Sequence, residues 1–276
     1  MSHAPITVLP CIAVALAETG NVWTIVVAGG GGARFGRLKQ YETIGEQRIV
    51  DHSVATAIAA GTNVVLVVPA NDVDAEMIQA GIVQAGLVQA GSLADDRAAT
   101  IVVVAGGETR AASVRCGLGA VPANAAIVCV HDAARPFASV ELYRAVVAGV
   151  RAGADAVVPG VAVTDTIKLI DATGVVTATP PRDALVAVQT PQAFCASVLR
   201  DAHRNLDEAT DDAALVESNG GRVIVVPGEI DNRKITHPGD LEWARREWAV
   251  RADAGRDAGR DAGCDDASAL VTGPQR

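Results

Sequence analysis

The chain has 276 residues, a formal net charge of −9 and an apolar fraction of 50%, of which aromatic residues supply very little. This length suits one sizeable α/β domain or two small ones, with a core built mainly from Val, Ile, Leu and Ala. The negative charge argues against a duplex nucleic-acid binder, whose surface is normally basic. It still allows a small anionic ligand held by a few local cations.

The cysteines and the N-terminal segment bear on the cellular compartment. None of the five cysteines forms a CxxC motif, which favours reduced thiols in a cytoplasmic enzyme over a disulfide framework or a zinc site. The apolar run from Val8 to Ala17 is interrupted by Pro10 and is too short to span a bilayer. It also lacks the basic region of a signal peptide, so we expect an N-terminal extension and no membrane partner.

Short apolar runs rich in Val and Ile alternate along the chain with Ala-rich segments at helical spacing. Continuous apolar runs are typical of strands buried on both faces, as in a parallel sheet covered by helices. We expect strands over residues 24–28, 64–69, 101–105, 126–131, 156–159 and 223–227. We expect helices over residues 49–60, 111–120, 139–152, 195–205, 211–218 and 238–251. The alternation predicts a doubly wound α/β fold, in which ligands bind beyond the carboxyl ends of the strands.

The first expected strand runs into the glycine-rich sequence AGGGGARFGRLK, which ends at Lys39. The Walker A pattern fails because Arg37 and Leu38 stand where Lys and Ser or Thr are required. The dinucleotide pattern GxGxxG fails at Phe35. Consecutive glycine amides can still form an anion-binding nest, and Arg34 and Lys39 offer positive charges to a triphosphate. Taken alone, the loop fits equally well a glycine-rich turn flanked by solvated cations.

Two later strands also end in polar motifs. The sequence AGGETRAAS places Gly107, Arg110 and Ser113 after one strand, and VHDAARP places Asp132 and Arg135 after another. Each motif alone could simply start or cap a helix. Together with the glycine loop, they fall at the carboxyl edge of one sheet and predict a ligand site there.

The segment VTDTIKLIDATGVVTATPPR interrupts the alternation of strands and helices. Its residues alternate with period two on both sides of an Asp-Ala-Thr-Gly turn, which predicts an inserted β-hairpin. The hairpin has no helix of its own to cover it and must pack on something else. A second subunit is a reasonable candidate.

The far C-terminal segment is a biased tract of Arg, Asp, Ala and Gly with almost no large apolar residues. Such a composition predicts a mostly disordered tail. The expected organisation is an extension over residues 1–22, one domain over 23–250 with an arm at about 161–183, and a tail over 251–276.

Five ordered motifs carry a resemblance to a known family: VHDAARP, DTIK, VQTPQAF, TDDAALVE and NRKITHPGDL. Spread over roughly residues 23–248, they resemble the 2-C-methyl-D-erythritol 4-phosphate cytidylyltransferase family. The resemblance implies a Rossmann-like nucleotidyltransferase sandwich with a mostly parallel sheet, and a homodimer whose hairpin arm reaches the partner's active site. It implies transfer of a cytidylyl group from CTP to methylerythritol phosphate with Mg²⁺, releasing pyrophosphate in the non-mevalonate isoprenoid pathway.

The resemblance also implies roles for individual residues. Catalysis would depend on Arg34, Lys39, Arg182 and Lys234. The CTP-binding residues would be Ala28, Gly29, Gly30, Gly32, Gly107, Glu108 and Ser113. The polyol phosphate would be held by Asp132, Arg135, Thr166 and Thr210. Asp132 would also be the protein ligand of Mg²⁺.

Some of these residues also have plainer interpretations. Thr210, followed by two acidic residues, is a good helix N-cap, and Arg182 could be a solvated charge on an edge strand. The chain also departs from the family at the glycine loop: Leu38 stands where a Pro is usual, and the path from Arg34 to Lys39 is short.

Three other functions compete with the implied one. A cytidylyltransferase for another polyol phosphate, such as ribitol 5-phosphate, would share most of these loops. A sugar-1-phosphate nucleotidyltransferase that uses UTP or GTP is a second alternative. A nucleotide-binding regulatory module without catalysis is a third, and the joint presence of Arg34, Lys39, Asp132 and Lys234 argues against it.

Overall fold

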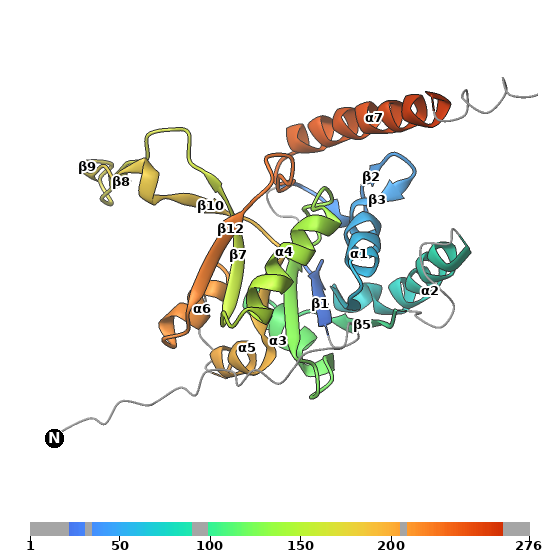
Figure 1. Ribbon diagram of the computed structural model, residues 1–276, viewed down its shortest axis with the longest axis horizontal. Helices are drawn as coiled ribbons and strands as arrows, with labels where there is room; N and C mark the ends of the chain where they lie inside the picture. Colours follow the sequence, from blue (N-terminus) through green and yellow to red (C-terminus); the bar gives the residue numbers. More distant parts are fainter. Residues whose placement is uncertain (1–21, 31–34, 90–98, 205–208, 262–276) are drawn as a thin grey trace, which may run out of the picture.

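The computed structural model describes residues 22–30, 35–89, 99–204 and 209–261, and its centre is an eight-stranded mixed sheet (Figure 1). The strand order is β10-β7-β11-β6-β1-β4-β5, and the eighth strand, β12, also pairs with β7. The strands are β1 (Val22–Val27), β4 (Asn63–Val68), β5 (Ile101–Ala105), β6 (Ile127–Asp132), β7 (Ala156–Ala162), β10 (Val186–Val188), β11 (Gln192–Cys195) and β12 (Val223–Pro227). β6, β1, β4 and β5 run parallel, as does the pair of β12 and β7, whereas β10 and β11 pair antiparallel with their neighbours.

Helices cover both faces of this sheet (Figure 1). Around the sheet lie α1 (Ile49–Ala59), α2 (Val73–Gln89), α3 (Arg110–Ala120), α4 (Val140–Arg151), α5 (Ala196–Ala202) and α6 (Asp212–Ser218), whereas α7 (Pro238–Asp261) packs away from it. The structure also contains short 3₁₀ helices: η1 (Lys39–Tyr41), η2 (Ala70–Asp72), which directly precedes α2, and η4 (Arg182–Ala184). The architecture is therefore the predicted α/β sandwich with a mostly parallel sheet.

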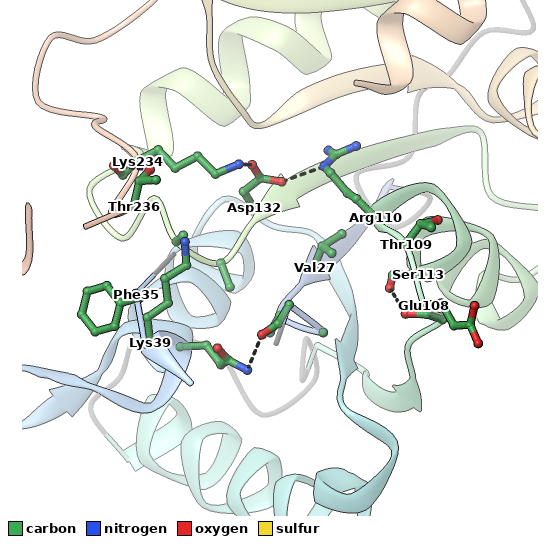
Figure 2. Close-up of a pocket in the computed structure, with 17 residues that line it drawn as sticks. Val27, Phe35, Lys39, Glu108, Thr109, Arg110, Ser113, Asp132, Lys234 and Thr236 are labelled. Atoms are coloured by element: carbon green, nitrogen blue, oxygen red, sulfur yellow. Dashed lines mark hydrogen bonds and ion pairs between the residues drawn. The ribbon is translucent and has the colours of Figure 1, made fainter. Parts of the chain in front are cut away.

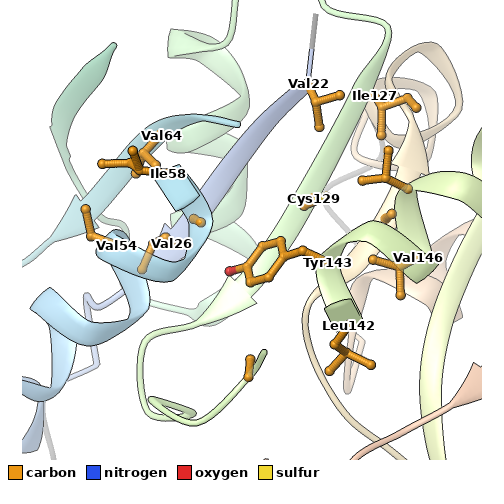
Figure 3. Close-up of a cluster of buried hydrophobic side chains, with 14 of the residues drawn as sticks. Val22, Val26, Val54, Ile58, Val64, Ile127, Cys129, Leu142, Tyr143 and Val146 are labelled. Atoms are coloured by element: carbon orange, nitrogen blue, oxygen red, sulfur yellow. The ribbon is translucent and has the colours of Figure 1, made fainter. Parts of the chain in front are cut away.

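The alternation of side chains along each strand builds two hydrophobic cores. Val22 and Val26 of β1 face α1 and α4, where they pack around the buried Tyr143 (Figure 3). Trp23 and Ile25 of the same strand face the opposite cluster, formed with α3, α5 and α6. Because successive strand residues point to opposite faces of the sheet, an unbroken apolar run places apolar side chains in the cores on both faces. Each fully buried Val or Ile contributes roughly 1.5–3 kcal/mol to stability.

All six predicted strands and all six predicted helices are present, with small shifts at most of their ends; the last helix, predicted to end at residue 251, continues to Asp261. The helix α2 and the strands β2 (Thr43–Ile44), β3 (Gln47–Arg48), β10 and β11 were not predicted. The strand β11 replaces the first residue of the helix expected from Cys195, so α5 begins at Ala196. Its sequence QAFC contains no long apolar run that would predict a strand. The strand is buried because it pairs on both sides, with β6 and with β7.

The predicted hairpin is present as β8 (Leu169–Ile170) and β9 (Val176–Ala178), which pair antiparallel and project from the body of the molecule (Figure 1). Its turn is held by Asp171, whose carboxylate accepts hydrogen bonds from the amides of Thr173 and Val175. Gly174 has φ of +86°, a left-handed conformation that glycine adopts without steric cost. Side chains on both strands are exposed in the single chain.

The C-terminal helix α7 packs across the small hairpin of β2 (Thr43–Ile44) and β3 (Gln47–Arg48) through a third apolar cluster. Its members include Phe35, which follows the glycine loop, and Ile235, which precedes the helix. The helix continues to Asp261, into the segment expected to be mostly disordered, where alanines favour helix. The remaining tail and the N-terminal extension lie outside the described residues.

Candidate active site

The carboxyl ends of β1, β5 and β6 open into a cavity of about 350 Å³ (Figure 2). As the sequence predicted, three separate motifs meet there. The glycine loop supplies one wall, the segment after β5 and the start of α3 a second, and the end of β6 a third. The lining residues are Val27, Ala28, Gly29, Gly30, Phe35, Lys39, Gln40, Gly107, Glu108, Thr109, Arg110, Ser113, Asp132, Ala133, Ala134, Lys234 and Thr236.

Close backbone packing explains the glycine after β5. A Cβ atom at Gly107 would lie 2.5 Å from the Cβ of Ala112, which is too close for any other residue without displacement. Ser113 donates a hydrogen bond to the Gly107 carbonyl (3.3 Å), and Thr109 caps α3 by accepting one from the Ala112 amide (3.0 Å). The loop therefore lies tightly against the N-terminus of α3, where the helix dipole favours a negatively charged ligand.

Asp132 is the electrostatic centre of the cavity. Its Oδ2 lies 2.6 Å from Lys234 Nζ, and its Oδ1 accepts a hydrogen bond from Arg110 Nε at 3.1 Å (Figure 2). Burial by itself would raise the pKa of Asp132, but the charges of Arg110 and Lys234 outweigh it and hold that pKa well below its usual range. The carboxylate is therefore ionised at every pH near neutrality.

Arg110 also reaches away from the cavity. Its Nη1 donates to Oδ2 of Asp212 at 2.8 Å, and the other oxygen of Asp212 contacts Nε2 of His203 at 2.9 Å. A continuous polar chain thus runs from His203 through Asp212, Arg110 and Asp132 to Lys234.

Lys39 connects the glycine loop to the segment that carries Lys234. Its Nζ donates a hydrogen bond to the carbonyl oxygen of Ile235 at 2.7 Å. The next residue, Gln40, is buried, and its Nε2 lies 3.5 Å from the carbonyl oxygen of Gly30. These contacts hold the end of the loop against the opposite wall of the cavity.

A second cavity of about 170 Å³ adjoins the first. Both are lined by Arg110, Asp132 and Lys234. The second is completed by Arg135, Val188, Gln189, Thr190, Gln192, Thr210 and Asp211. The shared residues form the boundary at which ligands in the two cavities would meet.

The walls of the second cavity are fixed by buried hydrogen bonds. Thr190 Oγ1 accepts from the Asp132 amide (3.0 Å) and contacts His131 Nδ1 (3.1 Å). Burial lowers the pKa of His131 to about 4, so its ring is neutral near pH 7. Arg135 donates to the Asn232 carbonyl at 2.8 Å. His131 thus has a structural role in this wall.

Most of the predicted site residues lie in these two cavities. The first is lined by Ala28, Gly29, Gly30, Lys39, Gly107, Glu108, Ser113, Asp132 and Lys234. The second adds Arg135 and Thr210. Arg34 and Gly32 lie outside the described residues.

Two predicted residues lie apart from both cavities of the single chain. Thr166 and Arg182 are exposed on the arm, and Arg182 Nη1 donates to the Thr164 carbonyl at 3.2 Å. The N-cap interpretation of Thr210 was wrong, because Asp211 caps α6 by accepting from the Ala214 amide. Thr210 is instead exposed at the second cavity.

Sequence reasoning gave no role to several lining residues, above all Arg110, Gln40, Phe35 and Thr236. Arg110 was noted within its motif, but its two carboxylate partners are 22 and 102 positions away in the chain. No local pattern signals such pairings. Phe35 follows the glycine loop directly, so its position beside the cavity could have been read from the sequence.

A search of the described residues finds no group of three or more His, Cys, Asp or Glu side chains arranged to hold a metal ion. Asp132 is the carboxylate at the junction of the two cavities. Mg²⁺ in nucleotide sites is commonly bound by one or two carboxylates together with substrate phosphates, so a single carboxylate is compatible with this ion.

Within the described residues, no helix combines the length and the apolar character needed to cross a membrane.

Comparison with known proteins agrees with this geometry. The family model for 2-C-methyl-D-erythritol 4-phosphate cytidylyltransferase matches residues 22–248. The enzyme of that name from Streptomyces coelicolor is 42% identical over 241 residues, a match that covers 82% of this chain and 84% of the relative. A protein named bifunctional enzyme IspD/IspF from Oleidesulfovibrio alaskensis is 51% identical over 143 residues. That match covers 50% of this chain and only 36% of the longer relative.

The fold comparison gives the same answer. The crystal structure of 4-diphosphocytidyl-2C-methyl-D-erythritol synthase from Anaerococcus prevotii superposes with a TM-score of 0.68 at 28% sequence identity. The superposition covers 83% of this chain and 99% of the other. On the strength of the matching family model and this geometry, the chain belongs to the 2-C-methyl-D-erythritol 4-phosphate cytidylyltransferase family.

Proposed function

We propose that this chain transfers the cytidylyl group of CTP to 2-C-methyl-D-erythritol 4-phosphate, giving 4-diphosphocytidyl-2-C-methyl-D-erythritol and pyrophosphate in the non-mevalonate isoprenoid pathway. The observation that carries the proposal is the shared boundary of the two cavities, formed by Arg110, Asp132 and Lys234. CTP would occupy the larger cavity under the glycine loop. The polyol phosphate would occupy the smaller one, with its phosphate directed at this boundary.

The reaction is an in-line displacement at phosphorus. A phosphate oxygen of the polyol phosphate forms a bond to the α-phosphorus of CTP, and the bond from that phosphorus to the bridging oxygen of the β-phosphate breaks. Lys234, at the boundary, would reduce the repulsion between the attacking phosphate and the triphosphate. Lys39 and Arg34 would neutralise the charge that develops on the leaving pyrophosphate. Positioning and charge stabilisation carry such reactions, and no covalent enzyme intermediate is needed.

The segment after β5 would select the base. Gly107, Glu108 and Ser113 line one end of the larger cavity, and backbone groups there can hydrogen-bond the edge of cytosine. The tight packing of Gly107 on Ala112 leaves this wall little freedom to move outward. A purine would therefore be too large for it.

The cofactor in this proposal is Mg²⁺. Asp132 would hold it together with oxygens of the triphosphate, and the ion would supply positive charge to the phosphates when bound. Each carboxylate oxygen has two lone pairs, so Asp132 can keep an ion-pair partner while it accepts a metal.

The partner in this proposal is a second copy of the same chain. The arm carries exposed apolar side chains, including Leu169 (51%), Ile170 (63%) and Val176 (52%), with no helix of its own to cover them. Thr166 and Arg182 would lie over the second cavity of the partner and bind the polyol phosphate there. A closed pair of chains would give two identical sites by symmetry.

We place the enzyme in the cytoplasm. Among the described residues, Cys116, Cys129 and Cys195 form no disulfide bond, as expected for a reducing compartment. The metabolites that the proposed reaction uses are also small and charged.

A panel of nucleotides and polyol phosphates tests the reaction directly. Pyrophosphate release should be fastest with CTP and methylerythritol phosphate, and slower by about 10²-fold or more with UTP, GTP or ATP, since a wrong base leaves buried polar groups unpaired. Ribitol 5-phosphate should be the poorer acceptor at equal concentration. Faster turnover with ribitol 5-phosphate would assign the chain to that substrate instead.

A mixing experiment tests the arm. Lys234→Ala and Arg182→Ala should each be nearly inactive alone, because each removes one cation from every site. If the arm completes the partner's site, a mixed dimer has one intact site, and mixing the two proteins should restore up to about a quarter of the wild-type rate. Mixtures that stay inactive after subunit exchange, shown by a tagged pull-down, would rule out a shared site.

A further inference from the structure

Two buried residues outside the assigned site belong to its polar chain. The side chain of Asp212 is 1% exposed and that of His203 is 2% exposed. They lie in different elements, since Asp212 begins α6 and His203 follows α5. Neither lines either of the two cavities described, so neither would touch CTP or the polyol phosphate bound there.

Their contacts converge on Arg110. One oxygen of Asp212 accepts from Arg110 Nη1 (2.8 Å), and the other contacts His203 Nε2 (2.9 Å). The same guanidinium reaches Asp132 through Nε at 3.1 Å. With one carboxylate on each side, the planar guanidinium has a fixed orientation, which a single partner would not impose.

We propose that Asp212, held by His203, is a positioning residue that acts through Arg110 on the Asp132–Lys234 pair. Arg110 lines both cavities, and its hydrogen bond to Asp132 holds the carboxylate to which Lys234 is paired. This inference rests on the proposed function, because Lys234 is the cation placed beside the attacking phosphate. It states that Asp212, at the start of α6, sets the orientation of Arg110 and, through it, of the Asp132–Lys234 pair, although Asp212 itself lies outside both cavities.

The start of α6 is well suited to hold this geometry. Asp211, one residue earlier, caps the helix through the Ala214 amide (3.0 Å) and accepts from Gln192 Nε2 of β11 (2.8 Å). Asp212 is thus attached to a capped helix end that is itself tied to the sheet. A carboxylate on such an end has little freedom to follow Arg110 if the guanidinium moves.

The chain contains a closely similar cluster away from the site, which serves as a control. Arg48 pairs with Asp51 (2.7 Å) and with Glu76 (2.6 Å), and both acids are mostly buried. None of the three lines either cavity. Loss of Glu76 therefore removes one of two carboxylates from a buried arginine without touching the site.

The test uses three variants of the full chain: Asp212→Asn, Arg110→Lys and the double variant that carries both changes. Glu76→Gln is the control. We expect Asp212→Asn to lower kcat by about 10–100-fold with KM for CTP changed by less than about 3-fold, the pattern of a lost transition-state alignment. Glu76→Gln should leave kcat within about 2-fold, although both substitutions disturb a buried ion pair. Equal kcat values for the wild type and a folded Asp212→Asn, verified by circular dichroism, would overturn the proposal.

The double variant separates action through Arg110 from a general loss of stability. If Asp212 works through Arg110, adding Asp212→Asn to Arg110→Lys should lower kcat by less than about 3-fold further. Multiplicative losses in kcat would overturn the proposal. A wild-type chain that releases no pyrophosphate from CTP and methylerythritol phosphate would instead refute the proposed function, before any variant is compared.

His203 provides a second test if Asp212→Asn does not fold. Glutamine can present an amide donor to Asp212, whereas alanine leaves its Oδ1 without this partner. We expect His203→Gln to keep kcat within about 3-fold of the wild type and His203→Ala to lower it by about 10-fold. Equal kcat for these two variants would overturn the role of His203.

Discussion

Replacement of Lys234 by alanine should abolish measurable turnover, with a loss of at least about 10²–10³-fold in kcat, while CTP still binds. The amine is 2.6 Å from Asp132 and lies at the boundary of the two cavities. Without it, nothing at that position would offset the repulsion between the attacking phosphate and the α-phosphoryl group. The measurement is pyrophosphate release, together with calorimetric titration of CTP.

The adjacent Arg233 offers a matched control for Lys234. It is also cationic, but its guanidinium lies 4.5 Å over the ring of Trp243, and it lines neither cavity. Arg233→Ala should therefore keep kcat within about 3-fold of the wild type. A Lys234→Ala enzyme that turns over at the wild-type rate would remove the role given to Lys234.

Replacement of Asp132 by asparagine should have the other large effect, a loss of about 10³-fold or more in kcat/KM together with lower stability. The substitution keeps the shape of the side chain but removes the charge between Arg110 and Lys234. Arg110 retains Asp212, and Lys234 is already partly exposed. We therefore expect the free energy of unfolding to fall by about 3 kcal/mol, at the low end for breaking a buried ion pair.

Asp51→Asn is the control for this variant. The side chains of Asp51 and Asp132 are 12% and 11% exposed, and each accepts hydrogen bonds from an arginine. Urea unfolding should show a loss of stability in both variants, whereas only Asp132→Asn should lose activity. If Asp51→Asn reduced kcat/KM as strongly, the loss in Asp132→Asn would reflect folding and not chemistry.

The parts of the fold that sequence predicted well are those with strong local patterns. The unbroken apolar runs of β1, β4 and β6 identified buried strands, and the period-two pattern around Asp171 identified the arm. By contrast, β10 and β11 are only three and four residues long, and the polar residues Gln189 and Thr190 lie between them. Their pairing is decided by β6 and β7, which lie elsewhere in the sequence.

Among the residues of the candidate site, those that follow a strand directly could be predicted from the sequence, whereas those defined by distant partners could not. Gly107 and Asp132 come directly after strands, so their place at the sheet edge could be predicted from the chain alone. The role of Arg110 could not, because its partners Asp132 and Asp212 become neighbours only when α6 packs beside the sheet. The roles assigned to the predicted residues stay predictions until the variants above are measured.

The sequence by itself determined the buried strands and the arm, because these depend on the periodicity of apolar residues and on a turn that contains glycine. Tertiary structure alone decided that Lys39 reaches the Ile235 carbonyl and that two cavities share one boundary. It also decided that Arg110 is held between two acids. The physical reason is that ion pairs and cavity walls depend on distances in space between residues far apart in the chain, which no local pattern encodes.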